Sequence, residues 1–154
     1  MQKRIELSDF KFRISRPVEW SDMDAARHVN NLVYLRWAET SRIAYFEQAG
    51  MDTSFADKLG VILAWQDCKY IFPMTYPDTA LIGIRTIELA DQHFTLQTGV
   101  FSEQHERLAA VCHQRIVPYD YLRLARVGLP ASWRAGISRL EDDDQPPTSP
   151  EEPD

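Results

Sequence analysis

One short segment, residues 20–31, holds most of the side chains that could do chemistry. It contains two carboxylates, one imidazole and two amides, on Asp22, Asp24, His28, Asn30 and Asn31. A bulky apolar stretch follows at residues 32–46, which predicts that the segment lies at the start of a helix. The first N–H groups of a helix are unpaired and lie at its positive end. They can polarise a carbonyl group while a nearby carboxylate attacks it or activates water, which is acyl-transfer chemistry.

The helix that must position this segment is predicted over residues 31–49, with Gly50 as its stop. Asn30 or Asn31 is a suitable N-cap. Apolar residues occupy two opposite arcs of this helix: Leu32, Leu35, Ile43 and Phe46 on one, and Val33, Trp37, Ala44 and Tyr45 on the other. A helix that is apolar nearly all round is predicted to be buried. Glu39 falls within the first arc, so we expect this acid to have a partner or a function.

Strands are predicted before and after the helix. Residues 10–20 read as a first strand that is interrupted at Pro17, and residues 61–72 form a mixed segment. Three long strands are predicted at 79–89, 92–102 and 107–117, and short helical pieces at 120–126 and 131–138. The short connections favour an antiparallel meander. Such a sheet must cover one face, and the long apolar helix is the element it can wrap.

Composition predicts one domain with an acidic tail. A chain of 154 residues with 44% hydrophobic content is long enough for one core, which we place at residues 1–140. Residues 141–154 carry seven acids, no base and four prolines, which predicts a disordered tail. The rest of the chain has 16 acidic and 17 basic residues. A nearly neutral body without a basic face argues against a nucleic-acid partner.

The chain also lacks the patterns of membrane, secreted and metal-binding proteins. No apolar run approaches 18 residues and no apolar signal region opens the chain, so we expect no membrane partner and a cytoplasmic location. Four scattered histidines without ligand spacing argue against a metal site. Cys68 and Cys112 are predicted to be buried free thiols, with a disulfide bond as the alternative.

The reactive segment resembles a known signature. Asp22-Met23-Asp24, followed by His28-Val29-Asn30-Asn31, Tyr34 and Trp37-Ala38-Glu39, resembles the 4-hydroxybenzoyl-CoA thioesterase branch of the hot-dog fold. Plant acyl-ACP thioesterases contain a related Asp-x-Asn-x-His-Val-Asn-Asn string. Residues 76–79 are similar to the Gly-Asp pair that opens the central strand in this family. The resemblance covers about residues 8–130. It implies an α+β hot-dog fold, in which a curled antiparallel sheet wraps one long buried helix, and an acyl-CoA thioesterase.

The resemblance also implies catalytic roles. Asp24 is expected to be the nucleophile or general base that acts on the thioester carbonyl. The peptide N–H of Asn31 is expected to stabilise the oxyanion. His28 could position water or donate a proton to the leaving thiolate. Ala26 stands where the plant pattern has an asparagine, which shifts oxyanion binding to backbone N–H groups.

Other residues are expected to support the catalytic loop and the helix, or to bind the substrate. We expect Asp22 to stabilise a turn, Asn30 to cap the helix, and Glu39 to hold the catalytic loop. Tyr34, Arg27 and Arg115 are candidate substrate-binding residues, the two arginines for the phosphates of CoA. No metal or redox cofactor is implied.

Two alternatives stay open at this point. An enoyl-thioester hydratase or dehydratase on the same fold could use the Asp24 and His28 side chains for proton transfer. A non-catalytic acyl-thioester-binding module is the second alternative, because a fold does not determine a function. Hot-dog domains expose a long sheet edge and place sites between protomers, so a homodimer or homotetramer is expected.

Overall fold

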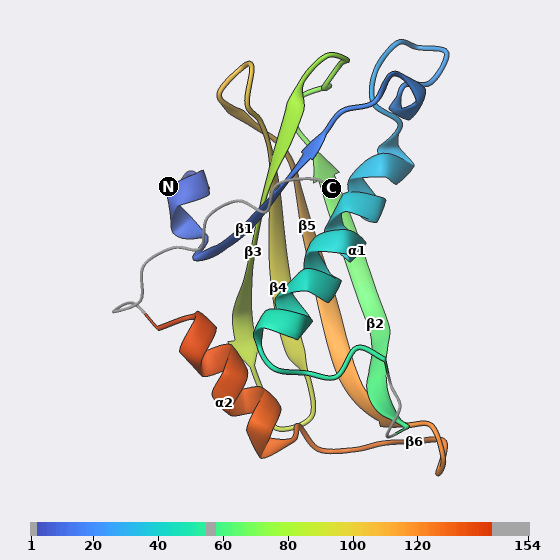
Figure 1. Ribbon diagram of the computed structural model, residues 1–154, viewed down its shortest axis with the longest axis vertical. Coiled ribbons are helices and arrows are strands. Elements are labelled where there is room, and N and C mark those ends of the chain that lie inside the picture. The colour runs from blue at the N-terminus through green and yellow to red at the C-terminus, as the bar shows by residue number, and fades with distance from the viewer. Residues whose placement is uncertain (1–2, 55–57, 143–154) are drawn as a thin grey trace.

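The computed structural model describes residues 3–54 and 58–142 (Figure 1). Two short 3-10 helices, two α-helices and six strands follow one another in these residues. In chain order they are η1 (Leu7–Asp9), β1 (Phe12–Pro17), η2 (Trp20–Asp22), α1 (Asn31–Gln48), β2 (Leu59–Tyr70), β3 (Thr79–Leu89), β4 (Phe94–Ser102), β5 (Arg107–Asp120), β6 (Ala125–Arg126) and α2 (Ala131–Leu140).

The strands form one antiparallel sheet in the order β1-β3-β4-β5-β2, with β6 paired to the end of β5. β3, β4 and β5 are the predicted meander. β4 lies in the middle of the sheet and is buried along its whole length. The sheet curls around α1, which crosses one of its faces diagonally (Figure 1). β2 is the long outer strand on one side, and among the described residues no strand pairs with its free edge.

α1 begins and ends close to the predicted positions. The Asn30 side chain accepts a hydrogen bond from the Leu32 N–H and is the N-cap. Gly50 follows the C-cap and adopts a φ of 82°, a conformation that glycine takes without strain. The helix therefore has the local signals of both ends.

Only one face of α1 packs against the sheet, whereas burial nearly all round was predicted. The buried residues are Val33, Tyr34, Trp37, Ala38, Ser41, Arg42, Tyr45 and Phe46. Leu32 is 63% exposed, and Leu35 and Ile43 are only partly buried. The prediction of a helix buried nearly all round is wrong, because a single curled sheet covers only one side of it. Most of the arc that carries Leu32, Leu35 and Ile43 stays uncovered in this chain.

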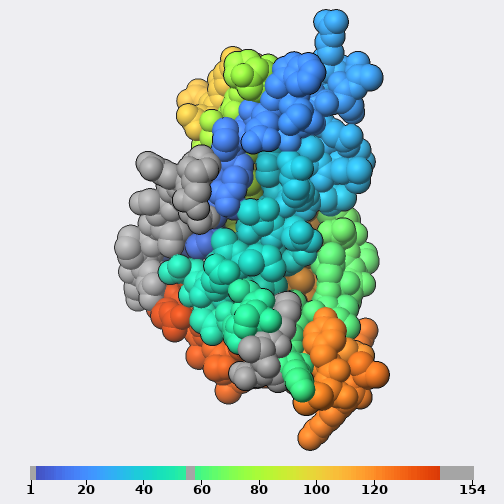
Figure 2. All heavy atoms as spheres, turned by 45° about the vertical axis from the view of Figure 1, so that its right-hand side comes forward, coloured from blue at the N-terminus to red at the C-terminus, as the bar shows by residue number. Residues whose placement is uncertain are grey.

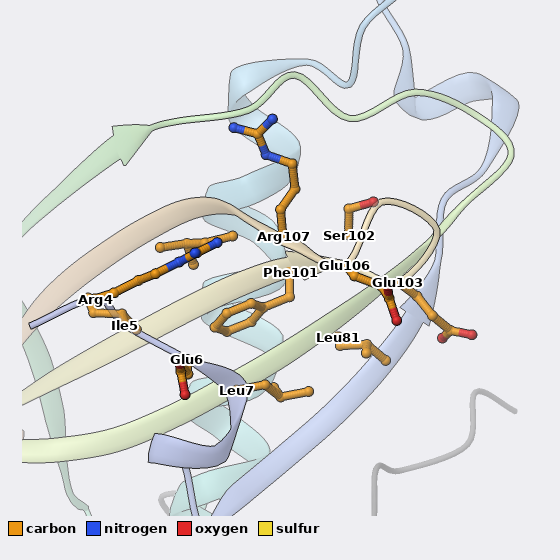
Figure 3. Close-up of a pocket in the computed structure, with 11 residues that line it drawn as sticks. Arg4, Ile5, Glu6, Leu7, Leu81, Phe101, Ser102, Glu103, Glu106 and Arg107 are labelled. Atoms are coloured by element: carbon orange, nitrogen blue, oxygen red, sulfur yellow. The ribbon is translucent and has the colours of Figure 1, made fainter.

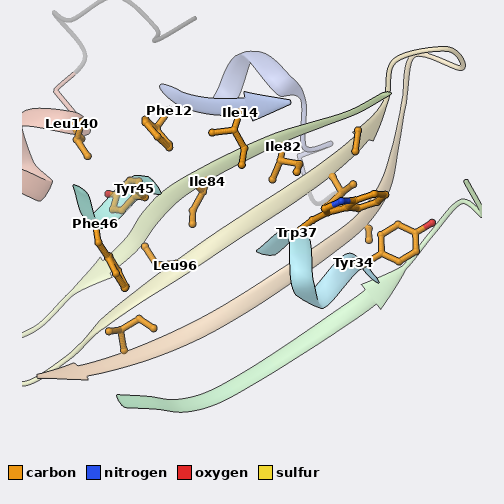
Figure 4. Packing of buried hydrophobic residues seen from close by; sticks show 14 of the residues in the cluster. Phe12, Ile14, Tyr34, Trp37, Tyr45, Phe46, Ile82, Ile84, Leu96 and Leu140 are labelled. Carbon is orange, nitrogen blue, oxygen red and sulfur yellow. The ribbon is translucent and has the colours of Figure 1, made fainter. Parts of the chain in front are cut away.

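The hydrophobic core fills the space between α1 and the sheet (Figure 4). Phe46 meets Phe94 edge to face at one end of the helix, and Tyr34 meets Trp37 in the same way at the other. The core is therefore continuous along α1, and it holds the start of the helix rigidly against the sheet.

Residues 120–126 are a turn and a short strand, so the prediction of a helical piece there is wrong. The Asp120 carboxylate accepts the N–H groups of Leu122 and Arg123, and Leu124 adopts a φ of 53°. An acceptor side chain at this position competes with a helical ladder, which explains the turn.

α2 packs across the C-terminal end of α1 and ends at Leu140, with Glu141 as its C-cap. The Glu141 carboxylate accepts hydrogen bonds from the Tyr45 hydroxyl and the Thr86 N–H. Glu141 therefore belongs to the folded body, although the predicted tail begins there. The rest of that tail, apart from Asp142, lies outside the described residues. Neither helix of the described part is long and apolar enough to cross a bilayer.

Candidate active site

Residues 22–30 form a short two-stranded ribbon at one end of the molecule. The Asn30 N–H donates to the Asp22 carbonyl, and the Asp24 N–H donates to the His28 carbonyl. Met23 and Val29 form a β-bridge between these two bonds. This blue segment projects at the top of the space-filling view (Figure 2). Asp24 lies on the first strand of this ribbon, and α1 begins directly after the second strand.

The Asp24 carboxylate is exposed at the tip of this ribbon. Its Oδ1 accepts the Ala26 N–H at 2.9 Å, and its carbonyl accepts the Arg27 N–H at 2.9 Å. These bonds close the turn and orient the carboxylate. Among the described residues, no other donor is bonded to this side chain. One carboxylate oxygen is therefore available to a ligand or a water molecule.

Asp22, in contrast, is a buried anchor. Its Oδ1 accepts from Arg36 Nη2 at 2.8 Å, and its Oδ2 accepts the Glu19 N–H at 2.8 Å. The first bond joins the ribbon to the second turn of α1, and the second closes η2. Asp22 thus stabilises the turn and also ties the loop to the helix.

The first turn of α1 leaves one N–H group without an acceptor in the described chain. The Asn30 N–H is bonded to the Asp22 carbonyl, and Leu32 and Val33 donate to Asn30. The Asn31 N–H has no such partner there. It lies at the positive end of an 18-residue helix, where a negative charge is stabilised.

β2, the outer strand, also contacts the first turn of α1. The Tyr70 hydroxyl donates to the Asn31 carbonyl at 3.1 Å, and its ring meets Tyr34 edge to face. Tyr34 is buried, and its hydroxyl accepts the Met74 N–H. The Tyr34 side chain is therefore buried beneath the first turns of α1. Its substrate-binding role stays a prediction.

A pocket of about 750 Å³ opens beside Asp24. It is lined by Trp20, Met23, Asp24, Ala25, Arg27, Thr75 and Tyr76. Trp20 is 73% exposed and Tyr76 is 47% exposed, so two aromatic rings border the carboxylate. An aromatic and aliphatic wall beside an exposed acid suits a ligand with an apolar part and a reactive polar group.

The loop also carries His28 and Arg27. Both side chains are exposed, and Arg27 adopts a φ of 62°, which makes the turn possible. In the described residues the imidazole of His28 has no hydrogen-bond partner. The ribbon brings His28 and Asp24 to paired positions through their backbones.

Glu39 lies away from this loop. Its side chain is 67% exposed and pairs with Arg42 at 3.6 Å. Arg42 is the buried member, and desolvation lowers the pKa of its guanidinium. The contact that ties the catalytic loop to α1 is made by Arg36, so the expected burial of Glu39 is wrong and its supporting role stays a prediction.

Arg115 lies on the face of the sheet that points away from α1. It pairs with Glu88 at 3.7 Å and lines a pocket of about 420 Å³ together with Trp65, His93 and Arg126. This pocket is separate from the one beside Asp24, so one protomer does not bring Arg115 and Asp24 together.

A further pocket of about 470 Å³ lies between the N-terminal segment and the upper ends of β3, β4 and β5 (Figure 3). Its lining includes the apolar side chains of Phe101 and Leu81 and the charged side chains of Arg4 and Arg107. Its lining contains none of the residues predicted to be catalytic. We therefore assign the candidate active site to the Asp24 pocket.

Sequence reasoning missed Arg36, Tyr70 and Met74, which fix the loop and the helix start. Each makes its contact with a residue at least 14 positions away, so no local pattern reveals it. Trp20 was within the predicted reactive segment, and Tyr76 within residues 76–79, which resemble the family's Gly-Asp pair. Exposed aromatic residues in loops are the signal that could have marked these two.

Within the part of the chain that the structure describes, no group of histidine, cysteine and acidic side chains could hold a metal ion. The site consists of a carboxylate, an imidazole and the N–H groups of a helix start. These groups can attack or hydrate a carbonyl compound and stabilise the resulting oxyanion.

Comparison with protein families identifies the superfamily to which the chain belongs. The model of the thioesterase-like superfamily matches residues 18–147. Among curated proteins, none matches this chain.

Solved structures share the fold. A thioesterase from Thermus thermophilus, complexed with coenzyme A and Zn, is 26% identical, with a TM-score of 0.77 over 86% of this chain and 96% of that one. A 1,4-dihydroxy-2-naphthoyl-CoA thioesterase from Synechocystis is 17% identical, with a TM-score of 0.76 over 88% and 98%. A protein from Pseudomonas aeruginosa is 21% identical, with a TM-score of 0.78 over 90% and 96%. These likenesses confirm the predicted hot-dog fold.

Proposed function

The chain belongs to the thioesterase-like superfamily, and from this premise we propose that it hydrolyses an acyl-CoA thioester to a free acid and CoA. The observation that carries the proposal is the ribbon of residues 22–30. It joins the exposed Asp24 carboxylate to the start of α1, where the Asn31 N–H has no acceptor in the described chain. The 26% identical relative, whose structure contains coenzyme A, supports the choice of thiol.

In this mechanism the thioester carbonyl lies between Asp24 and the start of α1. Asp24 attacks the carbonyl carbon, or removes a proton from the water that attacks it. In the first case a mixed anhydride forms and is then hydrolysed. The negative charge on the carbonyl oxygen is stabilised by the Asn31 N–H and by the positive end of the helix. CoA leaves as a thiolate and takes up a proton.

His28 is the candidate proton donor for this thiolate. It is paired with Asp24 across the ribbon, and the side chains of both residues are exposed. An imidazole can hold a proton near neutral pH, so it suits either water positioning or proton donation. The acyl group would contact Trp20 and Tyr76, the aromatic borders of the pocket.

The phosphates of CoA require positive charge. Arg27 lies in the lining of the Asp24 pocket itself. Arg115 and Arg126 lie beside Trp65 in the other pocket, an arrangement that suits a phosphate next to an aromatic ring. This second group can serve the Asp24 site only if two protomers associate.

We infer that the chain forms at least a homodimer through the free edge of β2 and the uncovered arc of α1. Leu32, Leu35 and Ile43 on that arc, and Leu63 and Trp65 on β2, are apolar residues that this chain leaves partly or fully exposed. Antiparallel pairing of two β2 edges places the Tyr70 end of one strand beside the Leu59 end of the other. Sedimentation equilibrium tests this, and a monomer at micromolar concentration would contradict it.

The experiment for the function is thiol release from short, medium, long and aromatic acyl-CoAs, with Asp24→Asn beside the wild type. The substitution keeps the shape of the side chain and removes its charge, so turnover should fall by roughly 10²-fold or more. Asp52→Asn is the matched control. Asp52 also accepts a backbone N–H two residues ahead, but it follows the opposite end of α1. This control should keep wild-type turnover.

Other outcomes separate the alternatives. A product that keeps its CoA would indicate an enoyl-thioester hydratase or dehydratase. Acyl-CoA binding without turnover, unchanged in Asp24→Asn, would indicate a binding module. Hydrolysis at the wild-type rate by Asp24→Asn would show that another group activates the water.

A further inference from the structure

Two cysteines face each other under the start of α1. Cys68 of β2 and Cys112 of β5 are direct partners in the antiparallel pairing, and their Sγ atoms are 3.0 Å apart. The chain has two cysteines, so each thiol has the other as its neighbour. Opposite residues in an antiparallel pair have Cα atoms about 4.5–5.5 Å apart, which lies within the range that a disulfide bond spans.

The two thiols differ in how far solvent and small reagents can reach them. Cys112 is completely buried, because it lies on the inner strand β5 between β4 and β2. Within one protomer Cys68 is only half-buried, because β2 is the outer strand. Its side chain packs on the core face of β2, and not along the backbone edge that would pair with a second copy. A small reagent can therefore reach Cys68 but not Cys112, which assigns them different steps in any thiol exchange.

Their hydrogen bond supports this division. The Cys112 S–H donates to the Cys68 sulfur, and this bond lowers the pKa of the Cys68 thiol below its ordinary value. The same bond and burial raise the pKa of Cys112. The accessible sulfur is therefore the better nucleophile, and the buried one keeps its proton until a mixed disulfide forms beside it.

We propose that Cys68 and Cys112 are a reversible dithiol–disulfide site that reacts with low-molecular-weight disulfides, with Cys68 as the attacking residue and Cys112 as the resolving residue. In the first step the Cys68 sulfur attacks one sulfur of a small disulfide, RSSR, and the S–S bond breaks; the released RS⁻ takes up the Cys68 proton and leaves as RSH. In the second step the Cys112 sulfur attacks Cys68 Sγ, the mixed disulfide bond breaks, and the Cys112 proton passes to the departing sulfur, which leaves as a second RSH. Two protein thiols are oxidised and one small disulfide is reduced to two thiols, so electrons and protons balance.

A disulfide bond between Cys68 and Cys112 would restrain the strand that contacts the start of α1. Tyr70 lies two residues beyond Cys68 on β2, and its hydroxyl donates to the Asn31 carbonyl. A bond from Cys68 to Cys112 would join the outer strand to β5 next to this contact. It would restrain the strand that holds the helix start, and it would close a loop of 44 residues. The oxidised protein should melt roughly 5–10 °C higher than the reduced protein.

The test treats the folded full chain with glutathione disulfide and then measures mass and free thiols after acid quenching and denaturation. The wild type should lose two hydrogens, keep no free thiol, and recover both thiols with dithiothreitol. Cys112→Ser should retain one glutathione on Cys68, because the resolving thiol is gone. Cys68→Ser should stay unmodified while folded, because Cys112 is buried.

The proposal is overturned if the wild type keeps two free thiols, stops at a glutathione adduct, or forms bridges between chains. If Cys112→Ser does not fold, limited alkylation of the reduced wild type replaces it. Iodoacetamide should then label Cys68 before Cys112 in peptide maps, and equal labelling would contradict the assigned roles. None of these readouts involves thioester hydrolysis, so the result is independent of the proposed function.

Discussion

Arg36 reaches back from the second turn of α1 and binds the Asp22 carboxylate with a distance of 2.8 Å between Nη2 and Oδ1. The carboxylate is 5% exposed, whereas the arginine side chain is 60% exposed. The second carboxylate oxygen accepts the Glu19 N–H. One buried acid therefore joins η2, the ribbon and the helix, and the loop that carries Asp24 is held from both sides.

The first prediction concerns this anchor. Asp22→Asn keeps the volume of the side chain but removes the charge and one acceptor, leaving either Arg36 or the Glu19 N–H poorly satisfied. We expect the free energy of unfolding to fall by about 1–3 kcal/mol. Because the ribbon also positions Asp24, kcat for thiol release should fall with little change in KM. Urea denaturation and steady-state kinetics measure both effects.

Arg36→Gln provides the control for this contact. The single substitution should cost less stability than Asp22→Asn, because Arg36 is mostly exposed and can reach solvent. In the double variant the two costs should not add, with a coupling of at least about 0.5 kcal/mol. Strict additivity would show that the pair does not hold the loop.

The second prediction separates the Asn31 backbone from its side chain. Asn31→Pro removes the peptide N–H, and proline is well accepted at the first position of a helix. Asn30, the preceding residue, has φ −59° and ψ 139°, which a following proline tolerates. We expect kcat to fall by roughly 10²–10³-fold, as for the loss of an oxyanion donor.

Asn31→Ala is the matched control, because it keeps the N–H and removes only an exposed side chain. Its turnover should stay near the wild-type value. Circular dichroism must show the same helix content in both variants. Wild-type turnover by a folded Asn31→Pro would exclude this N–H as the oxyanion donor.

The contrast between Asn31 and Arg36 also shows what could be predicted from the sequence. The helix was predicted over residues 31–49 and is observed at Asn31–Gln48, because the cap and the stop are local signals. The strand at 79–89 was predicted with its observed bounds, since alternation and a turn define it locally. Contacts such as Arg36 with Asp22 depend on tertiary packing, and no local spacing encodes them.

The errors have physical causes as well. Periodicity identified two apolar arcs on α1 but could not tell which one the sheet covers, so Glu39 was predicted buried and is exposed. Residues 120–126 have good helix formers, yet the side chain of Asp120 accepts two N–H groups and makes a turn instead. The first error concerns which face of the helix the sheet covers, and the second concerns a side-chain hydrogen bond; periodicity encodes neither.

The third prediction concerns Gly136, where α2 crosses the end of α1. A Cβ atom at this position would lie 1.8 Å from the Ala49 carbonyl oxygen, and a backbone atom cannot move aside easily. Gly136→Ala should therefore lower the free energy of unfolding by about 2–3 kcal/mol. Chemical denaturation gives this value.

Ser138→Ala on the same helix is the control. Ser138 is exposed, so its substitution should change stability by no more than about 0.5 kcal/mol. Helix propensity alone would make Gly136→Ala stabilising by about 1 kcal/mol. A stabilised variant would therefore show that the two helices do not approach this closely.

The fourth prediction concerns Tyr45, which is fully buried with its hydroxyl 2.6 Å from Glu141 Oε1 and 2.7 Å from Thr86 Oγ1. Burial, followed by the Glu141 charge, raises the pKa of this phenol above its ordinary value of 10. Below about pH 10 both states keep the proton, whereas above it only the unfolded state releases it, so folding stability falls as pH rises. Tyr45→Phe lacks this proton and should be less stable than the wild type at about pH 8, because it loses both hydrogen bonds. In urea titrations this difference should shrink by about 1 kcal/mol between about pH 10 and 11, because the unfolded phenol is only half ionised at its pKa of 10. A constant difference would show that Tyr45 ionises as freely in the folded protein as in the unfolded chain.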